Sequence, residues 1–456
     1  MRGIRKESYA GALVVSMALT MGAVPRSFAQ QSAPASSPQE VAPAGDYTDG
    51  LALGSWKVFP SLFVGAVYNT NFNQAATNGD SGTSLRVVPH VAATYDGGIH
   101  KATVYGVLDG QFFNANTLAA NAGISYAYQP MDDLTFNFWG NYTRETDIFN
   151  SAFNFNNGAI FPTAIPNTTI PIILNPFGTT PGVNPIAFNQ FTGGGTVTKT
   201  VDQFFVTLGG TAYYIAFDHP DSAPVPFQTS HDGANYWVTG RVGYHFIPQL
   251  YVFGEGDGIF QRSNNSLFNT NGYRVLGGIG SDDQQSLFRF EVYGGYQVQN
   301  QQSQLVTVLN QQNQVVTVSG IPTDVNSSVF GGRLTYFPTQ YWTITAQVDQ
   351  TLGISSSLSL TIPQGVPTKV TSAILQTNYG ISRDWSAGAR VGYSQGDFFG
   401  QSGLNNHGWM AGATFNYQIW RNLLLTLDYQ HNAVESNAPN SNFTNNIYTA
   451  GVTYRY

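Results

Sequence analysis

The chain contains no cysteine among its 456 residues, and only 10% of its residues are charged. Without cysteine it has no disulfide framework, which fits an exported protein that folds without disulfides. Soluble domains carry roughly 25% charged residues, so a soluble protein of this size would have a more charged surface. A net charge of −7 also argues against nucleic acid as a partner, because that partner requires a basic surface.

Long apolar runs are missing as well. The longest, residues 10–24, is shorter than the roughly 20 residues that a membrane-spanning helix needs. A cationic segment with Arg2, Arg5 and Lys6 precedes it, and Ser27 and Ala29 are small residues at the two positions that a signal peptidase reads, as is typical of a cleaved signal peptide. We expect cleavage after Ala29, followed by a flexible Pro/Ala/Ser-rich leader over residues 30–55.

The pattern that is present is an alternation with a period of two. Over residues 448–456, aromatic and apolar residues alternate with Thr449, Gly451, Thr453 and Arg455. Such a segment forms a strand with one apolar and one polar face, and residues 342–349 and 409–419 behave in the same way. Because no further sequence covers so many apolar faces, the pattern predicts an all-β, antiparallel, transmembrane up-and-down β-barrel surrounded by lipid.

The connectors between these segments alternate between short and long. Short ones occur at residues 96–98, 130–133, 247–249, 282–284, 338–340, 383–384 and 420–422. The long polar ones are 69–82, 149–183, 218–233, 263–271, 300–324, 353–367, 398–406 and 435–445. Short periplasmic turns and long extracellular loops are typical of outer-membrane barrels.

Two long stretches flank residues 201–217 and interrupt this alternation. The alternation is restored if residues 185–195 form an additional strand that turns near residues 195–200. We therefore expect 18 strands within residues 56–456, with both ends of the barrel periplasmic. Without the additional hairpin the count would be 16.

Aromatic residues gather beside the short connectors. Rings prefer the headgroup level of a membrane, so this position predicts a girdle at one interface, although aromatics flank turns in other β proteins too. The residues are Tyr128, Phe246, Tyr251, Phe337, Tyr341, Trp342, Trp385 and Trp420.

The segment Val67–Phe72, followed by Ser84–Val91, resembles a family of β-barrel porins from the outer membranes of diderm bacteria. A looser resemblance extends through Tyr244–Pro248 to the last strand. It implies an outer-membrane location, lipid around the barrel, and a passive pore for small hydrophilic solutes that are neutral or weakly charged. It also implies that Tyr456 contacts the barrel-assembly machinery and that a homotrimer is one expected assembly.

Other functions compatible with a barrel are adhesion, anchoring, polysaccharide export and, less so, hydrolysis. Histidine and acid residues occur close together only at His219 with Asp221 and at His231 with Asp232, too few to form a metal site. No nucleophile elbow or phosphate-binding loop is present. We therefore expect a non-enzymatic protein without a cofactor or metal.

Charged residues on the polar face of the strands are candidates for lining the pore. An arginine facing lipid at mid-membrane would cost about 2–4 kcal/mol, so the interior is the favourable place. These groups either pair as networks that tie strands together, or form a transverse field that orients dipolar solutes; both roles can coexist. The candidates are Arg86, Asp109, Glu145, Arg241, Glu255, Asp257, Arg274, Arg289, Glu291, Arg333, Asp349, Arg390, Asp428 and Arg455.

Residues 148–198 contain no Asp, Glu, Lys or Arg. A loop without charge is expected to bury its apolar groups, and the barrel mouth offers the space. By analogy with porins whose third extracellular loop folds inward, we hypothesise a constriction lined by aromatic and amide groups. The candidates are Phe153, Phe155, Asn156, Asn157 and Phe161. A loop packed between subunits or over the rim is the alternative.

Deletion of residues 155–180 tests the constriction. If this segment narrows the pore, its removal should raise the single-channel conductance measured in planar bilayers. An unchanged conductance would contradict the hypothesis.

Overall fold

A computed structural model describes residues 50–72, 77–113, 117–145, 187–217, 232–264, 269–281, 286–301, 305–309, 315–319, 324–354, 367–399, 405–436 and 442–456. Within these ranges every regular element is a β-strand. In the same ranges no helix is long and apolar enough to cross a membrane.

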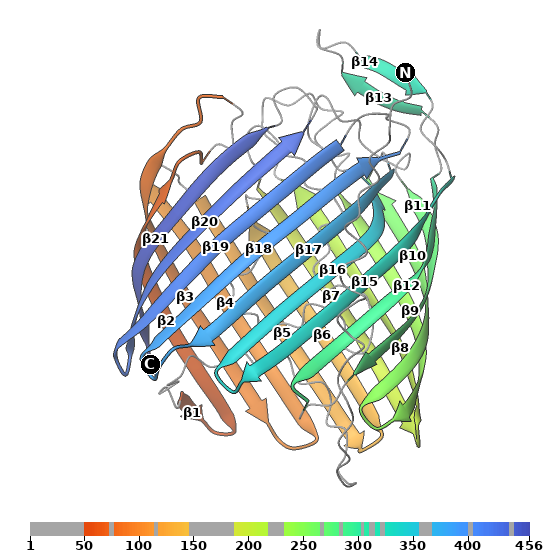
Figure 1. The fold of residues 1–456 in the computed structure, drawn as a ribbon, viewed down its shortest axis with the longest axis horizontal. Helices are drawn as coiled ribbons and strands as arrows, with labels where there is room; N and C mark the ends of the chain where they lie inside the picture. The colour runs from red at the N-terminus through yellow and green to blue at the C-terminus, as the bar shows by residue number, and fades with distance from the viewer. Residues whose placement is uncertain are drawn as a thin grey trace. The chain divides into compact units, whose positions relative to one another are not determined.

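The strands are long and follow one another closely (Figure 1). In chain order they are β1 (Leu51–Leu53), β2 (Trp56–Asn69), β3 (Gly82–Asp96), β4 (His100–Phe113), β5 (Thr117–Met131), β6 (Leu134–Glu145), β7 (Phe188–Val201), β8 (Phe204–Phe217), β9 (Gly233–Ile247), β10 (Leu250–Ser263), β11 (Thr270–Ser281), β12 (Phe288–Gln301), β13 (Leu305–Leu309), β14 (Val315–Ser319), β15 (Asp324–Thr339), β16 (Trp342–Ile354), β17 (Pro367–Gly380), β18 (Trp385–Phe398), β19 (Asn405–Trp420), β20 (Leu423–Ser436) and β21 (Phe443–Arg455).

Pairing between the first and last long strands closes the barrel. Each of the strands β2–β12 and β15–β21 pairs antiparallel with its neighbour, and β21 pairs with β2 from Ser61↔Arg455 to Asn69↔Ile447. The sheet has 19 strands, and β1 lies outside this cycle, which leaves 18 in the closed barrel. The expected architecture and strand count are therefore confirmed.

The additional hairpin exists, but the sequence placed its turn wrongly. The strand β7 continues to Val201, and the turn is formed by Asp202 and Gln203 instead of residues 195–200. Asp202 has a φ of 54°, which supplies the left-handed conformation of a tight turn. The expected turn residues, 195–200, and the glycines at 193–195 all lie inside the strand. There Gly194 lies beneath the ring of Trp139 from β6, and a Cβ on it would stand 2.5 Å from that ring.

Two short elements lie outside the 18-strand cycle. The strand β1 pairs with the start of β2, from Leu51↔Val58 to Leu53↔Trp56, where β2 extends past the end of β21. It thus covers backbone groups that would otherwise form an open edge. The strand occupies the end of the segment that we expected to be a flexible leader. The strands β13 and β14 pair only with each other, within residues 300–324 that we expected to be a loop.

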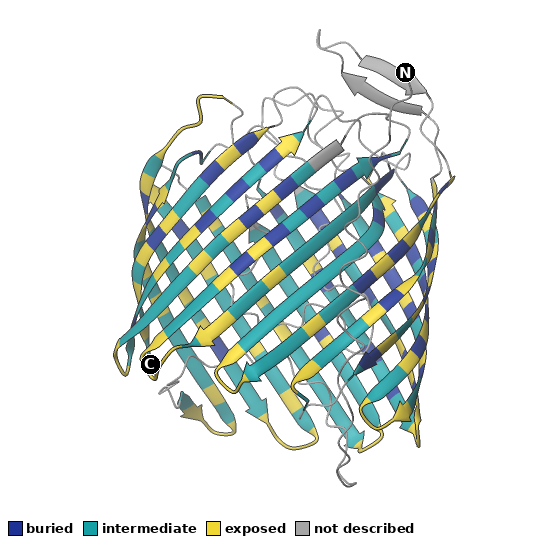
Figure 2. Cartoon of the chain, viewed as in Figure 1, coloured by how far each residue is buried: buried dark blue, intermediate teal, exposed yellow. Residues whose placement is uncertain are grey.

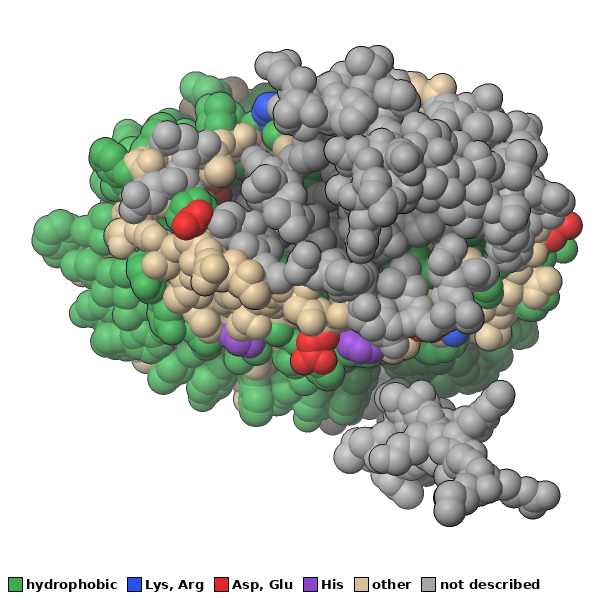
Figure 3. All heavy atoms as spheres, turned by 90° about the horizontal axis from the view of Figure 1, so that it is seen from above, with side chains coloured by type: hydrophobic (Ala, Val, Ile, Leu, Met, Phe, Trp, Pro, Cys, Tyr) green, Lys and Arg blue, Asp and Glu red, His purple; other side chains and the backbone are tan. Residues whose placement is uncertain are grey.

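Exposed and buried residues alternate along strands such as β9 and β10, and Figure 2 shows how far each residue of the barrel is buried. On β10, Val252 and Phe260 are 43% and 38% exposed, whereas Phe253, Glu255 and Asp257 between them are at most 6% exposed. Seen from above, hydrophobic side chains cover much of the visible outer perimeter (Figure 3). The exposed set of alternating residues therefore faces lipid, and the buried set between them faces the lumen. We call these two sets the outward and the inward parity of a strand.

Aromatic residues form pairs on the outer surface near the short turns. Trp385 stacks on Tyr417 with ring centroids 4.0 Å apart, and Trp342 lies 5.7 Å from Tyr379. Phe246, Tyr341 and Trp420 are exposed and Tyr128 stacks on His100. Two of the expected girdle residues, however, face the lumen. Tyr251 donates a hydrogen bond to Glu291, and Phe337 lies against the Arg289 guanidinium, because both share the inward parity of their strands.

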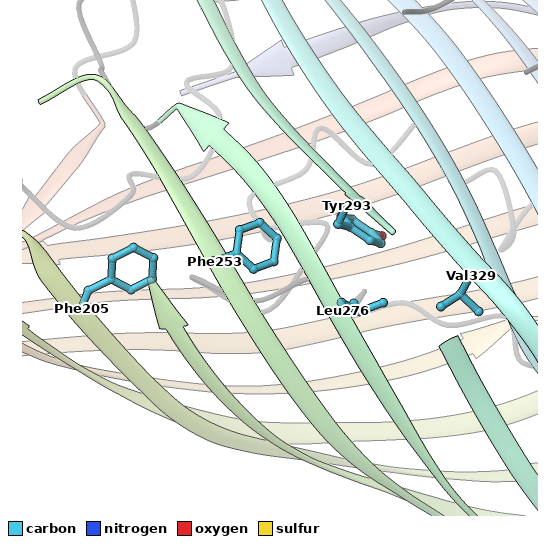
Figure 4. Close-up of a cluster of buried hydrophobic side chains, with 5 residues drawn as sticks. All are labelled: Phe205, Phe253, Leu276, Tyr293 and Val329. Atoms are coloured by element: carbon cyan, nitrogen blue, oxygen red, sulfur yellow. The ribbon is translucent and has the colours of Figure 1, made fainter. Parts of the chain in front are cut away.

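Inside the barrel, aromatic rings lie flat across glycines of the neighbouring strand. An inward cluster of Phe205, Phe253, Leu276, Tyr293 and Val329 spans β8 to β15 (Figure 4). A Cβ built on Gly243 would stand 2.1 Å from the Phe205 ring. A Cβ on Gly278 would meet Phe253 at 2.6 Å, and one on Gly331 would meet Tyr293 at 2.3 Å. Glycine at these positions therefore lets the rings lie close to the sheet.

A matched pair of glycine substitutions tests this packing. Gly243→Ala should displace the Phe205 ring and destabilise the barrel by about 1–3 kcal/mol, as overpacking does. Gly256→Ala is the control, because a Cβ built on Gly256 would have no neighbouring atom within 4 Å. The measurement is the temperature at which the folded band disappears on an electrophoresis gel. Equal transition temperatures for the two variants would contradict the packing argument.

Candidate functional site

The lumen-facing surface of the strands is the candidate functional site. The described side chains among the pore-lining candidates all lie on the inward parity, and none of them is exposed. Glu145 belongs to β6, but its side chain lies outside the described residues. The constriction candidates between residues 153 and 161 also lie outside them, so the constriction stays a prediction.

An ion-pair network connects β9 to β12. The Arg241 guanidinium lies 2.5 Å from the Glu291 carboxylate and 3.6 Å from that of Glu255. Glu255 is in turn 3.4 Å from Arg274, whose Nε donates to Asp257 at 2.7 Å. Arg241, Arg274, Glu255 and Asp257 are at most 4% exposed. The sequence suggested which residues face inward. The structure shows which of these five charged side chains, the two arginines and the three carboxylates, contact one another.

Aromatic rings complete the environment of these arginines. The Arg241 guanidinium carbon lies 3.5 Å from the centroid of Phe253 and within 6.0 Å of those of Phe205 and Tyr251. The Arg274 guanidinium lies 5.1 Å from the Trp237 ring. Cation–π contacts strengthen when the cation is desolvated, so the rings partly replace water around the buried charges. We call this surface, the lumen-facing side chains of β9 to β12, the sealed wall.

Charged candidates next to the sealed wall have mixed surroundings. The carboxylate of Asp349 accepts hydrogen bonds from Tyr293 and, at 2.5 Å, from the Gln347 amide. Arg333 on β15 stands opposite Glu291 in the register. Away from the sealed wall, Arg455 lies on β21 opposite Ser61, at the short-turn end of the barrel.

A second ion pair ties β18 to β20. The Arg390 guanidinium donates two hydrogen bonds to the Asp428 carboxylate, both at 3.0 Å, and further ones to Thr414 and Gln430. Arg390 is 8% exposed. The fork geometry fixes the positions of three strands relative to one another.

The third ion pair is more open to the lumen. Arg86 on β3 donates to the carboxylate of Asp109 on β4 from both Nε and Nη2, at 2.9 and 2.5 Å. These two side chains are 21% and 23% exposed, in contrast to those of the sealed wall. They can therefore meet a solute that passes through the lumen.

Sequence reasoning missed a set of uncharged lumen residues, because attention went to charge. Tyr105 on β4, Asn121 on β5, and Asn141 and Thr143 on β6 share the inward parity and are half-buried. The Tyr105 hydroxyl donates to Asn121 Oδ1 at 2.5 Å and to Asn141 Oδ1 at 3.3 Å. Both amides donate to the Thr143 hydroxyl, at 3.3 and 3.4 Å. We call these four residues the amide row; the period-two pattern could have revealed it.

In the described part of the chain, no three His, Asp or Glu side chains lie close enough together to hold a metal ion. What the lumen offers is paired charge together with hydroxyl and amide groups. Such a surface can hydrate and orient a polar solute.

Removal of one buried charge tests the network of the sealed wall. Arg241→Ala leaves Glu255 and Glu291 without their common partner, and breaking a buried pair costs about 3–5 kcal/mol. We expect a clear drop in the temperature at which the folded barrel converts to the unfolded form.

The control is Lys199→Ala on β7, next to the turn between β5 and β6. Lys199 forms an exposed pair with Asp133, and its hydrogen bond lowers the pKa of the Asp133 carboxyl. Exposed pairs contribute little, so this variant should keep the transition temperature of the unmodified protein. If the two variants lost the same stability, the network would not have the structural role described.

Comparison with known proteins agrees with the architecture. Residues 175–456, well over half of the chain, match the family described as Putative beta-barrel porin 2. Among curated proteins no sequence matches the chain significantly.

Several solved structures match this chain at low identity and with TM-scores below 0.5. OpdQ of Pseudomonas aeruginosa is 10% identical, with a TM-score of 0.40 over 88% of this chain and 98% of that one. OccAB4 of Acinetobacter baumannii is 10% identical, with a TM-score of 0.41 over 88% and 99%. OccK2 (OpdF) of Pseudomonas aeruginosa, solved with glucuronate, is 8% identical, with a TM-score of 0.41 over 87% and 97%. The family match, however, carries the assignment: the chain belongs to this family of β-barrel porins and is a passive channel for small solutes in the outer membrane.

Proposed function

We propose that the channel favours small hydrophilic solutes that are neutral or weakly charged. The observation that carries this proposal is the pairing of lumen charges within the barrel wall. Arg86, Arg241, Arg274 and Arg390 each contact a carboxylate on a nearby strand. Their fields therefore cancel over short distances, and little net field acts on a passing ion.

The rest of the lumen surface supports the same proposal. Its described side chains include many hydroxyl and amide groups, which donate and accept hydrogen bonds without carrying charge. Half-buried examples are Asn121, Asn141, Thr143 and Asn416. Barrels of 16–18 strands leave an aqueous channel, so water and polar solutes can share this space. In this proposal the activity is transport and not hydrolysis.

Reversal potentials test the charge balance. The unmodified protein should give a value close to zero in planar bilayers under a KCl gradient. Arg86→Ala leaves Asp109 uncompensated in the half-open part of the lumen, so the pore should become cation-selective. Asp109→Ala should shift the selectivity in the opposite direction for the same reason.

Lys199→Ala serves as the control, since it removes a cation from the outward parity of β7 and should leave the reversal potential unchanged. A strongly selective unmodified pore would contradict the proposal. A protein that gives no conductance at all would favour the anchoring or adhesion alternative.

A further inference from the structure

The lumen surface is divided into a closed and an open part. On the sealed wall Arg241 is 1% exposed and Glu255 is 3% exposed. In contrast, the Arg86 and Asp109 side chains are 21% and 23% exposed, and the amide row beside them is half-buried. A solute in the lumen can therefore contact β3 to β6 more readily than β9 to β12.

The amide row has hydrogen-bonding capacity left over. An asparagine side chain offers two N–H donors and two acceptor lone pairs. Among the described residues, Asn121 and Asn141 each use one N–H on Thr143, and their oxygens accept from Tyr105. The bonds of 3.3–3.4 Å are long, and a better-placed solute hydroxyl can replace them at small cost.

The ion pair extends this surface along the barrel. Asp109 lies four residues beyond Tyr105 on the same face of β4, about 13 Å along the strand. Asn121 stands opposite Val107, between these two positions. A hydroxyl-rich solute would thus meet amide and hydroxyl groups first and then the Arg86–Asp109 pair, or the reverse, without leaving this surface.

We propose that the amide row with the Arg86–Asp109 pair is a saccharide-binding path through the lumen. Sugar hydroxyls both donate and accept hydrogen bonds, which matches amides, a threonine hydroxyl and a neutralised Arg–Asp pair. The Tyr105 ring adds an apolar surface for the C–H face of a sugar. The inference rests on the proposed function, because it names the solute class for the same lumen.

Substitutions that remove the amides but keep their size test the path. The variant Asn121→Leu/Asn141→Leu is compared with Asn416→Leu. Asn416 is also an inward, half-buried amide, which donates a hydrogen bond to Ser386 and accepts one from Thr426, but it lies on β19. Liposome swelling is measured with glucose and with a neutral oligo(ethylene glycol) of similar size, which has no hydroxyl-rich ring.

The glucose-to-glycol ratio of entry rates should fall roughly three- to tenfold in the double variant, as expected for lost hydrogen bonds. It should stay unchanged in Asn416→Leu. An unchanged ratio in the double variant, or an equal fall in the control, overturns the saccharide path. If the double variant loses glycol entry as well, the glucose-to-glycol ratio of entry rates is measured for Thr143→Val instead. A fall in that ratio supports the saccharide path, and an unchanged ratio overturns it. If the unmodified protein admits neither solute, the proposed function itself has failed.

Discussion

Backbone hydrogen bonding in lipid is the constraint on which this structure depends. No water is available inside the bilayer, so every N–H and C=O group must find its partner within the protein. Eighteen antiparallel strands achieve this only because β21 returns to β2 and pairs with it from Ser61 to Asn69. The end of β2 that extends past this pairing is covered by β1. Among the described strands, closure thus leaves no long edge open.

Closure also sends every second side chain into the lumen, where it must pack or be hydrated. On the side formed by β8 to β15, rings lie flat over Gly243, Gly278 and Gly331. The arginines of the sealed wall then lie against these rings and beside carboxylates. Glycine, aromatic and ion-pair positions form one packing arrangement, because each ring needs the space of a glycine and each buried arginine needs a ring or a carboxylate.

The lumen surface of β3 to β6 is built differently. There the Arg86–Asp109 pair and the amide row keep part of their surface accessible, although Trp139 on β6 is buried. A barrel that buries most of its paired charges can leave another part of the lumen to contact solutes. In the proposed function, passage is then governed by width and hydrogen bonding more than by electric charge.

The sequence alone determined the architecture, and for most strand residues it determined whether the side chain points to lipid or to the lumen. Alternation with a period of two, and short turns alternating with long loops, are local properties, so they predicted a barrel of 18 strands with charges inward. The turn expected at residues 195–200 lies inside β7 instead, where Gly194 makes room for the Trp139 ring of another strand. Only the tertiary structure decided which charges meet: Arg241 on β9 reaches Glu291 on β12 across two intervening strands. That contact depends on the register and tilt of several strands at once, which barrel closure sets and which no single segment encodes.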